Sequence, residues 1–421
     1  MFIKYRNRQK EAVIRPKLMW TLLIIFIYML GRMMPVTTVE MNQALLHSLE
    51  SKQLLNSLAS VTGAQLSNVT LFSLGLSPWM TTMILWRFFT VFGMLKELTT
   101  VQLHRYRMLL TLVIAVIQAV GLTVGAKFVV LEFFGSYGPA VAQWGTVLLL
   151  VTGAVVLSWL GNINGQKGFG GMMIIVVVNM IISFQQNLIN YFKQNTFTGQ
   201  ELAIRAILFI IVLVFLIHLT VILYRGEYRI PIKRIGINNA FNDTSYLPIR
   251  VTPAGAMPFM YGMTLMMLPP YIISILLHYL PNNGILIFLA TTIGITKLPG
   301  AILYLTLLYI LAIGFAYYNY DSYDIAKNMR NNGDFIEGIK PGQATKEFIH
   351  NKVKLLSQFG AIMVVLIGGG PVLIAVIQNS GGGNISIAML ISNAYIITTL
   401  ILAVVEQVNT LQNWKKYRNL I

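Results

Sequence analysis

The sequence has no cysteine and few charged residues. Without cysteine the chain can form neither a disulfide nor a thiolate metal site. Charged residues make up only 11% of the 421 positions and hydrophobic residues 56%, whereas soluble globular proteins carry about 25% charged residues. This composition excludes water as the main solvent of the folded chain.

Chemically reactive side chains are also scarce. The chain has 14 acidic residues and five scattered histidines, namely His47, His104, His218, His278 and His350. None of them falls into the H-E-x-x-H pattern of zinc hydrolases, and no G-x-S-x-G nucleophile motif is present. The glycine-rich stretches at 368–370 and 381–383 lack the Lys-Ser/Thr of a phosphate-binding loop. The sequence therefore predicts no catalytic residues, no metal site and no cofactor.

Long apolar runs dominate what the sequence does contain. A helix needs about 20 mainly apolar residues to cross the core of a bilayer, and these runs do not alternate as the strands of a membrane barrel would. Ten runs meet the requirement, at residues 18–34, 69–92, 108–131, 141–160, 172–189, 202–224, 254–280, 295–320, 355–377 and 385–405. They predict an all-α membrane protein with ten transmembrane helices.

The net charge of +17 has two possible explanations, nucleic-acid binding or membrane topology. Most of the 31 Lys and Arg residues fall in the two termini and in one set of loops, while the alternate loops contain few. Because cytoplasmic loops are enriched in Lys and Arg, this set is assigned to the cytoplasm. The pattern predicts a multi-pass membrane protein with both termini cytoplasmic and no nucleic-acid partner.

Three connections are long enough to form structures of their own. Two are cytoplasmic, at about 225–253 and 321–354. The first predicts a β-hairpin between 228–235 and 246–251, and the second predicts two helices joined by turns, the later helix continuing into the ninth span. The third, at about 36–68 on the outer side, has one short apolar helix face. It either lies on the membrane surface or folds back into the bundle, and the sequence leaves both open.

A small-solute secondary transporter and an intramembrane enzyme are the alternatives from other classes. Transporters usually keep ionisable groups near the middle of the membrane for the substrate and the coupling ion. The polar residues at that depth are Gln118, Asn179, His218 and His278, with no acid among them. Coupling to protons or sodium therefore has little support, and an enzyme would need the nucleophile or metal cluster that the sequence lacks.

Four segments, in the same order along the chain, resemble a known family. They are LFSLGLSPWM at 71–80, SYLPIRV with AGAMP at 245–258, GDFIEGIKPG at 333–342 and EQVNTL at 406–411. They resemble the second span, the entry into the seventh span, the large cytoplasmic loop and the end of the tenth span of the SecY family, the pore subunit of the bacterial protein-export channel. Departures from the family pattern at 162–172 and at Arg87 point to its accessory branch in Gram-positive bacteria.

The resemblance implies two five-span halves, residues 1–192 and 193–421, around an hourglass pore with an outer plug at about 36–68. It also implies a lateral gate between the second and third spans and the seventh and eighth, with Thr81, Thr82 and Gln118 along it. Such a pore would be narrowest at a ring of aliphatic residues: Leu76, Met80, Met173, Val177, Met260 and Ile396. An aliphatic ring offers ions and water no hydrogen-bond partner and blocks them by dewetting.

Partners follow from the same resemblance. Energy would come from a SecA-type ATPase or from a translating ribosome, and the choice stays open. Docking would use the basic cytoplasmic loops, through Arg229, Lys233, Arg234 and Lys340. A SecE-like small membrane subunit would clamp the halves in the bacterial cytoplasmic membrane, and a secretory preprotein would be the cargo. The accessory branch further implies accessory Sec proteins and serine-rich glycosylated adhesins.

Arg87 is unusual because it lies inside the second span, where the family commonly has Gln. A centred arginine costs ~2.5 to 3.5 kcal/mol on insertion scales. The side chain could extend to the cytoplasmic end of the span, or it could face the pore or a partner. The sequence does not decide between these two positions.

Overall fold

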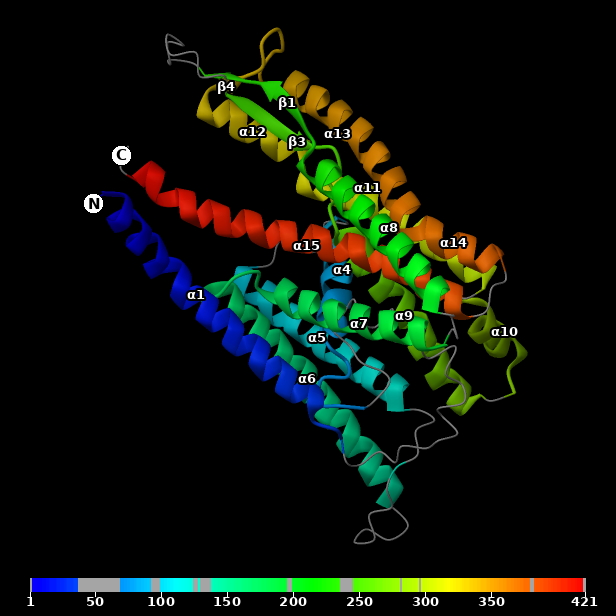
Figure 1. The fold of residues 1–421 in the computed structure, drawn as a ribbon. Helices are drawn as coiled ribbons and strands as arrows, with labels where there is room; N and C mark the ends of the chain where they lie inside the picture. The colour runs from blue at the N-terminus through cyan, green and yellow to red at the C-terminus, as the bar shows by residue number, and fades with distance from the viewer. Residues whose placement is uncertain are drawn as a thin grey trace.

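The computed structural model describes residues 2–36, 69–91, 99–123, 128, 138–194, 199–234, 245–280, 282–294, 297–378 and 382–418. Most of them are helical (Figure 1). The first half of the chain forms α1 (Phe2–Met33), α4 (Ser77–Val91), α5 (Thr100–Thr123), α6 (Gly138–Lys167) and α7 (Met172–Gln194). The second half forms α8 (Gly199–Arg225), α9 (Met257–Tyr279), α10 (Gly284–Thr292), α11 (Leu298–Asn319), α12 (Ser322–Asn332), α13 (Gln343–Val364), α14 (Gly370–Ile377) and α15 (Gly382–Arg418).

Among the described residues, nine helices are long and apolar enough to cross a membrane. The second predicted span is shorter than expected, because α4 has 15 residues and begins at Ser77 instead of residue 69. The chain before it turns repeatedly, with a bond from Gly75 N to Phe72 O of 2.9 Å. Gly75 has a φ of 55°, which glycine adopts without strain. The all-α membrane fold is confirmed, with α4 as a shortened tenth span.

The irregular segment before α4 is held inside the protein. Val36 N donates to Val69 O at 2.9 Å and Leu71 N donates to Met34 O at 3.2 Å, so this segment pairs with the chain that follows α1. The carbonyl of Leu71 lies where a Cβ of Gly153 on α6 would be, so this close approach requires glycine. Non-helical backbone at membrane depth is tolerated when it is buried in protein.

The two long connections fold together into one structure. β1 (Glu227–Pro231) pairs antiparallel with β3 (Tyr246–Arg250), which confirms the predicted hairpin. The predicted first strand does not continue to residue 235 in that pairing. Instead β2 (Lys233–Arg234) pairs with β4 (Asp334–Phe335) from the second connection. We call this unit, residues 227–234, 245–250 and 322–356, the polar lobe.

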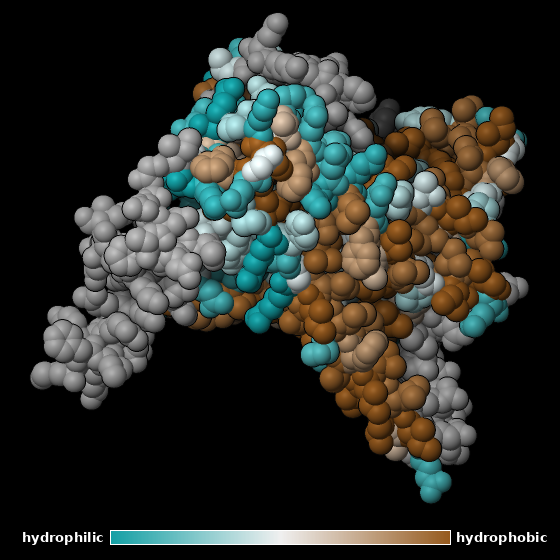
Figure 2. All heavy atoms as spheres, turned by 90° about the horizontal axis from the view of Figure 1, so that it is seen from above, coloured by the Kyte–Doolittle hydropathy of each residue, from teal (hydrophilic) through white to brown (hydrophobic). Residues whose placement is uncertain are grey.

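The polar lobe has its own apolar core. That core consists of Ile230, Ile249, Met329, Ile336, Ile349 and Val353. Figure 2, which looks onto this side of the molecule, shows polar residues over the lobe and hydrophobic residues over the neighbouring helices. In Figure 1 both chain ends lie toward the side of the strands and α12, and α10 lies at the far end.

Two predicted features fall outside the described residues. They are the turn of the hairpin at 235–244 and all of the plug segment except Val36. The plug therefore stays a prediction.

Gly368 allows a prediction about how tightly the helices pack. It lies in the π-helical segment Val365–Gly369, where an added Cβ would overlap the ring of the fully buried Phe259. Gly368→Ala should lower the stability of the purified protein by about 1–3 kcal/mol, as overpacking does. Gly314→Ala on α11 is the matched control, since nothing lies within 4 Å of its Cβ position and alanine favours helix. Equal thermal midpoints for the two variants in one detergent would contradict this packing.

Candidate functional site

Six aliphatic side chains predicted for the ring belong to the main hydrophobic core of the membrane helices. They come from α4 and the residue before it, from α7, from α9 and from α15, and are Leu76, Met80, Met173, Val177, Met260 and Ile396. All six belong to one contiguous hydrophobic cluster, in which Met173 alone of the six is only partly buried. This cluster draws on both halves of the sequence and contains many residues besides these six, so their arrangement as a ring stays a prediction. We call these six residues the collar.

Hydroxyl groups beside the collar bond to the backbone of their own helices. Thr81 and Thr82 donate to carbonyl oxygens four residues earlier, at 2.9 and 2.8 Å. Thr264 donates in the same way to Met260 O at 2.7 Å. Because the carbonyl oxygen of the preceding turn can satisfy a helical Ser or Thr, each of these three hydroxyl groups has a hydrogen-bond acceptor in its own helix.

The predicted gate residues lie on one side of the contact between α4–α5 and α9–α11, which we call the seam. Gln118 Nε2 donates to Thr81 Oγ1 at 3.4 Å, joining α5 to α4. Thr82 bonds within α4. All three are fully buried (0% exposed). The structure therefore brings Gln118 and Thr81 together, but their hydrogen bond does not cross the seam.

Two hydroxyl groups that the sequence did not single out do cross it. Ser274 Oγ on α9 lies 3.2 Å from Gly121 O on α5 and 2.9 Å from Tyr271 O on its own helix, so its one hydrogen is shared between the two acceptors. Thr264 Oγ1 contacts Met80 Sδ on α4 at 3.6 Å. A Cβ at Gly121 would come within 2.8 Å of the Cβ of Tyr271, so the backbones of α5 and α9 approach closely there. A single Ser or Thr in an apolar run gives no sequence signal of its partner on another span.

Arg87 on α4 lies against three aromatic rings across the seam. Its guanidinium carbon is 4.0 Å from the ring centroid of Tyr318, 4.4 Å from that of Phe315 and 5.6 Å from that of Tyr261. Nη1 of Arg87 is buried and has no hydrogen-bond partner among the described residues. The faces of aromatic rings attract a guanidinium charge. The sequence left two positions open for Arg87, the cytoplasmic end of the span and a place facing the pore or a partner. It did not predict contact with these rings.

Two predicted docking residues tie the halves of the polar lobe together. Arg234 Nε and Nη2 donate to the Asp334 carboxylate at 2.7 and 3.2 Å, and Lys233 Nζ donates to Glu337 at 2.9 Å. The hydrogen bonds to Asp334 raise the pKa of the Arg234 guanidinium, which stays charged. These ion pairs join β2 to the second connection. The two connections predicted to be cytoplasmic, at about 225–253 and 321–354, therefore form one surface.

The other two docking residues carry more accessible charge. Arg229 has a side chain that is 63% exposed and lies 3.7 Å from the Glu227 carboxylate. Lys340 is exposed and makes no ion pair with any residue that the structure describes. Exposed cations of this kind can steer an acidic partner toward a surface.

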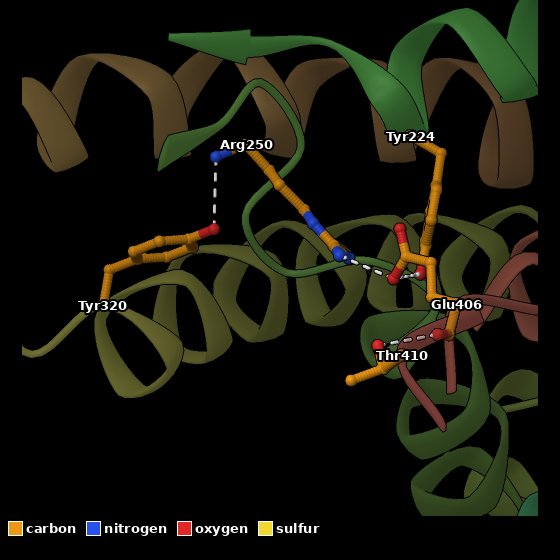
Figure 3. A network of polar contacts seen from close by, with 5 residues as sticks. All are labelled: Tyr224, Arg250, Tyr320, Glu406 and Thr410. Atoms are coloured by element: carbon orange, nitrogen blue, oxygen red, sulfur yellow. Dashed lines mark hydrogen bonds and ion pairs between the residues drawn. The ribbon is translucent and has the colours of Figure 1, made fainter. Parts of the chain in front are cut away.

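A polar network connects the hairpin to the end of α15 (Figure 3). Glu406 accepts hydrogen bonds from Tyr224 at 3.0 Å and from Arg250 Nη2 at 2.8 Å, and its own carbonyl accepts from Thr410 at 2.9 Å. Arg250 N also donates to the Tyr320 hydroxyl at 3.2 Å. Burial lowers the pKa of Arg250, but Tyr224 and Glu406 outweigh it and the net shift is upward.

The next residue of α15 makes a contact to the first half of the chain. Gln407 Oε1 accepts from Gly170 N, in the turn between α6 and α7, at 2.8 Å. Consecutive residues of α15 therefore hold the hairpin and the α6–α7 turn. The sequence marked 406–411 as a motif without giving these two residues a role.

The described residues hold no group of three or more His, Cys, Asp or Glu that could bind a metal ion. Their membrane-spanning helices instead pack on one hydrophobic core, and the polar lobe lies at one end of them. This arrangement defines a multi-pass α-helical membrane protein with a polar lobe on one side.

The SecY family model matches residues 70–413. The chain belongs to the SecY family, which confirms the resemblance found in the sequence. An accessory Sec system protein translocase subunit SecY2 from Streptococcus parasanguinis is 49% identical over the full length of both chains. A protein of the same name from Leuconostoc gelidum is 33% identical over 99% of each chain. Another from Streptococcus gordonii is 36% identical over 86% of this chain and 88% of the relative. The accessory branch is thereby confirmed as well.

Solved structures share the fold. One described as the structure of a protein conducting channel has a TM-score of 0.62 and 16% identity, covering 95% of this chain and 93% of that one. Sec61 in the canine ribosome-channel complex has a TM-score of 0.59 and 15% identity, with the same coverage. At these identities the likeness shows the fold alone.

Proposed function

We propose that the protein is the pore-forming subunit of an accessory Sec translocase, which passes unfolded secretory polypeptides across a bacterial cytoplasmic membrane. The observation that carries this proposal is a buried hydrophobic core that contains the collar residues and joins helices of both halves of the sequence, in a chain of the SecY family. Membership of that family does not favour the small-solute transporter.

The collar acts as the barrier in this proposal. Aliphatic side chains give ions and water no hydrogen-bond partner, so a narrow collar excludes them by dewetting. Methionine side chains are unbranched and adapt to varied surfaces, and Met80, Met173 and Met260 supply half of the collar. The same residues can therefore part for an extended polypeptide of any sequence and close around it.

The seam acts as the lateral exit for hydrophobic segments. Residues 1–192 and 193–421 form the two halves that separate there, and the segment 36–68 plugs the outer side. Hydrogen bonds between membrane helices contribute only ~0.6 kcal/mol on average, so bonds such as Ser274 to Gly121 keep the seam closed without locking it.

Both termini and the polar lobe face the cytoplasm in this proposal, as the distribution of Lys and Arg favours. The lobe binds a SecA-type ATPase through Arg229, Lys233, Arg234 and Lys340, and a SecE-like membrane subunit and accessory Sec proteins complete the translocase. The names of the relatives support a subunit of an accessory Sec translocase. The particular partners and a cargo of serine-rich glycosylated adhesins follow from the family resemblance of the sequence.

A photoreactive amino acid placed at Ile396 tests the pore directly. During export of a preprotein stalled by a folded C-terminal domain, Ile396 should cross-link to the moving chain, because a collar residue contacts whatever fills the pore. Ile401 on the same helix is 43% exposed and serves as the control that should cross-link to lipid or to another subunit. Cross-linking of the preprotein at Ile401 and not at Ile396 would refute the assignment.

A further inference from the structure

Arg87 joins two groups of helices that lateral opening would separate. It belongs to α4, whereas Tyr261 belongs to α9, and Phe315 and Tyr318 belong to α11. The ring centroids lie 4.0 to 5.6 Å from its guanidinium carbon. The rings of Tyr261 and Phe315 are also stacked, with centroids 5.0 Å apart and an angle of 17° between their planes. Two of the three rings therefore also pack against each other.

The environment of Arg87 makes this contact stronger than the other polar contacts that we described across the seam. Those contacts are a neutral hydrogen bond from Ser274 and a hydroxyl–sulfur contact from Thr264, and neutral bonds between membrane helices are weak. Cation–π attraction increases when the cation is removed from water. Nη1 of Arg87 is buried without a hydrogen-bond partner in the described structure, and the three ring faces beside the guanidinium stabilise its charge.

The contact lies at the end of the seam nearest the polar lobe. α4 ends at Val91, four residues after Arg87, and α11 ends at Asn319, directly after Tyr318. α9 begins at Met257, four residues before Tyr261. A hydrophobic segment that arrives from the side of the lobe would meet this end of the seam first.

We propose that Arg87, with Tyr261, Phe315 and Tyr318, is a cation–π latch that holds the seam closed and sets how hydrophobic a signal segment must be to open it. This inference rests on the proposed lateral opening of the seam. An entering segment must separate the guanidinium from the rings, so a segment that gains little from burial leaves the seam closed. Arg87 is in this sense a residue that determines specificity for the signal segment.

Spin labels on either side of the seam test the latch in the full chain. Val113 on α5 and Ile302 on α11 are 47% and 48% exposed, and the absence of native cysteine allows both to be labelled as cysteine variants in lipid nanodiscs. Arg87→Gln should raise the population of long label-to-label distances about tenfold, measured by pulsed electron paramagnetic resonance without any peptide, because loss of the cation–π attraction shifts the closed–open equilibrium.

Two further variants separate the latch from a general loss of stability. Tyr318 is 58% exposed, so Tyr318→Leu should fold normally and still raise the open population. Adding Arg87→Gln to it should produce a smaller further increase than Arg87→Gln produces in the unmodified chain, because only Phe315 and Tyr261 then remain to be lost. Arg107→Gln is the matched control. Arg107 also lies over a ring, that of Trp86 at 5.6 Å, and also has a buried nitrogen without a described partner, but it joins α5 to α4 on one side of the seam. Its distances should equal those of the unmodified chain.

A synthetic hydrophobic signal peptide distinguishes failure of the latch from failure of lateral opening. If the peptide separates the labels in the unmodified chain while Arg87→Gln without peptide does not, the latch is refuted and lateral opening stands. If neither the peptide nor Arg87→Gln separates them, lateral opening is refuted and the latch with it. If Arg107→Gln opens the seam as much as Arg87→Gln, the effect is one of general destabilisation and the latch is refuted.

Discussion

Replacing Leu76 with Ser and Ile396 with Asn should make the resting channel conduct small ions. Both side chains are fully buried (0% exposed). Leu76 directly precedes α4, and Ile396 belongs to α15. A polar group in an apolar site is costly unless it finds a hydrogen-bond partner, and water is the partner that can enter there. Once the collar is hydrated, dewetting no longer blocks ions. Planar-bilayer recordings on the purified double variant should show a resting conductance at least about tenfold above that of the unmodified channel.

A matched double variant shows whether the effect belongs to the collar. Val147 and Leu150 are buried in a second apolar cluster between α5 and α6. Val147→Asn with Leu150→Ser should therefore lower stability by ~1 to 3 kcal/mol and leave the resting membrane sealed. A well-folded Leu76→Ser/Ile396→Asn variant that stays silent would remove these residues from the pore.

The same collar variant should also export preproteins with weakened signal segments. A hydrated and less tightly packed collar needs less free energy to open, so the demand on the signal segment falls. Export assays with a shortened apolar segment measure this, and unchanged selectivity in a leaky variant would show that the collar seals the pore without contributing to selection.

The membrane helices could be predicted from the sequence because each forms within its own apolar run. Their hydrogen bonds connect residues four apart, and lipid leaves them few alternatives. The start of α4 at Ser77 could not be predicted in this way. It depends on the turn at Gly75 and on the contact between the Leu71 carbonyl and Gly153. Leu71 and Gly153 are about 80 residues apart in sequence, so the sequence near residue 69 carries no sign of this contact. The apolar run from residue 69 therefore looks like uninterrupted helix.

The candidate site shows the same limit. Aliphatic residues that line a pore look like any other packing residues, and only the family motifs distinguished Leu76 or Met260 from the rest. Arg87 was conspicuous as a charge in a span, but its rings come from residues more than 170 positions later in the chain. Even the hairpin, which forms locally, gave no sign that Arg234 would pair with Asp334, 100 residues away.

Reversing the accessible charge of the polar lobe should weaken docking of a SecA-type ATPase. Arg229→Glu with Lys340→Glu changes two exposed cations that do not tie β2 to the second connection, so the lobe should keep its fold, because exposed charges contribute little to stability. Charge complementarity mainly sets association rate and partner choice. We therefore expect about a hundredfold lower affinity at low salt, measured by biolayer interferometry with the channel in nanodiscs, and a smaller difference as salt screens the charges.

A charge swap separates the sum of the charges from the shape of the lobe. Arg234→Glu alone removes a cation and also breaks the bidentate pair with Asp334, so its effect on docking has two possible causes. Arg234→Asp with Asp334→Arg restores an ion pair between β2 and β4 and leaves the net charge of the lobe unchanged. If the motor responds to the overall positive field, the swapped protein should bind nearly as well as the unmodified one, while Arg229→Glu/Lys340→Glu should not.

Full affinity in Arg229→Glu/Lys340→Glu at low salt would exclude these residues from the docking surface. Loss of affinity in the swap despite an intact lobe would show that the motor contacts Arg234 itself.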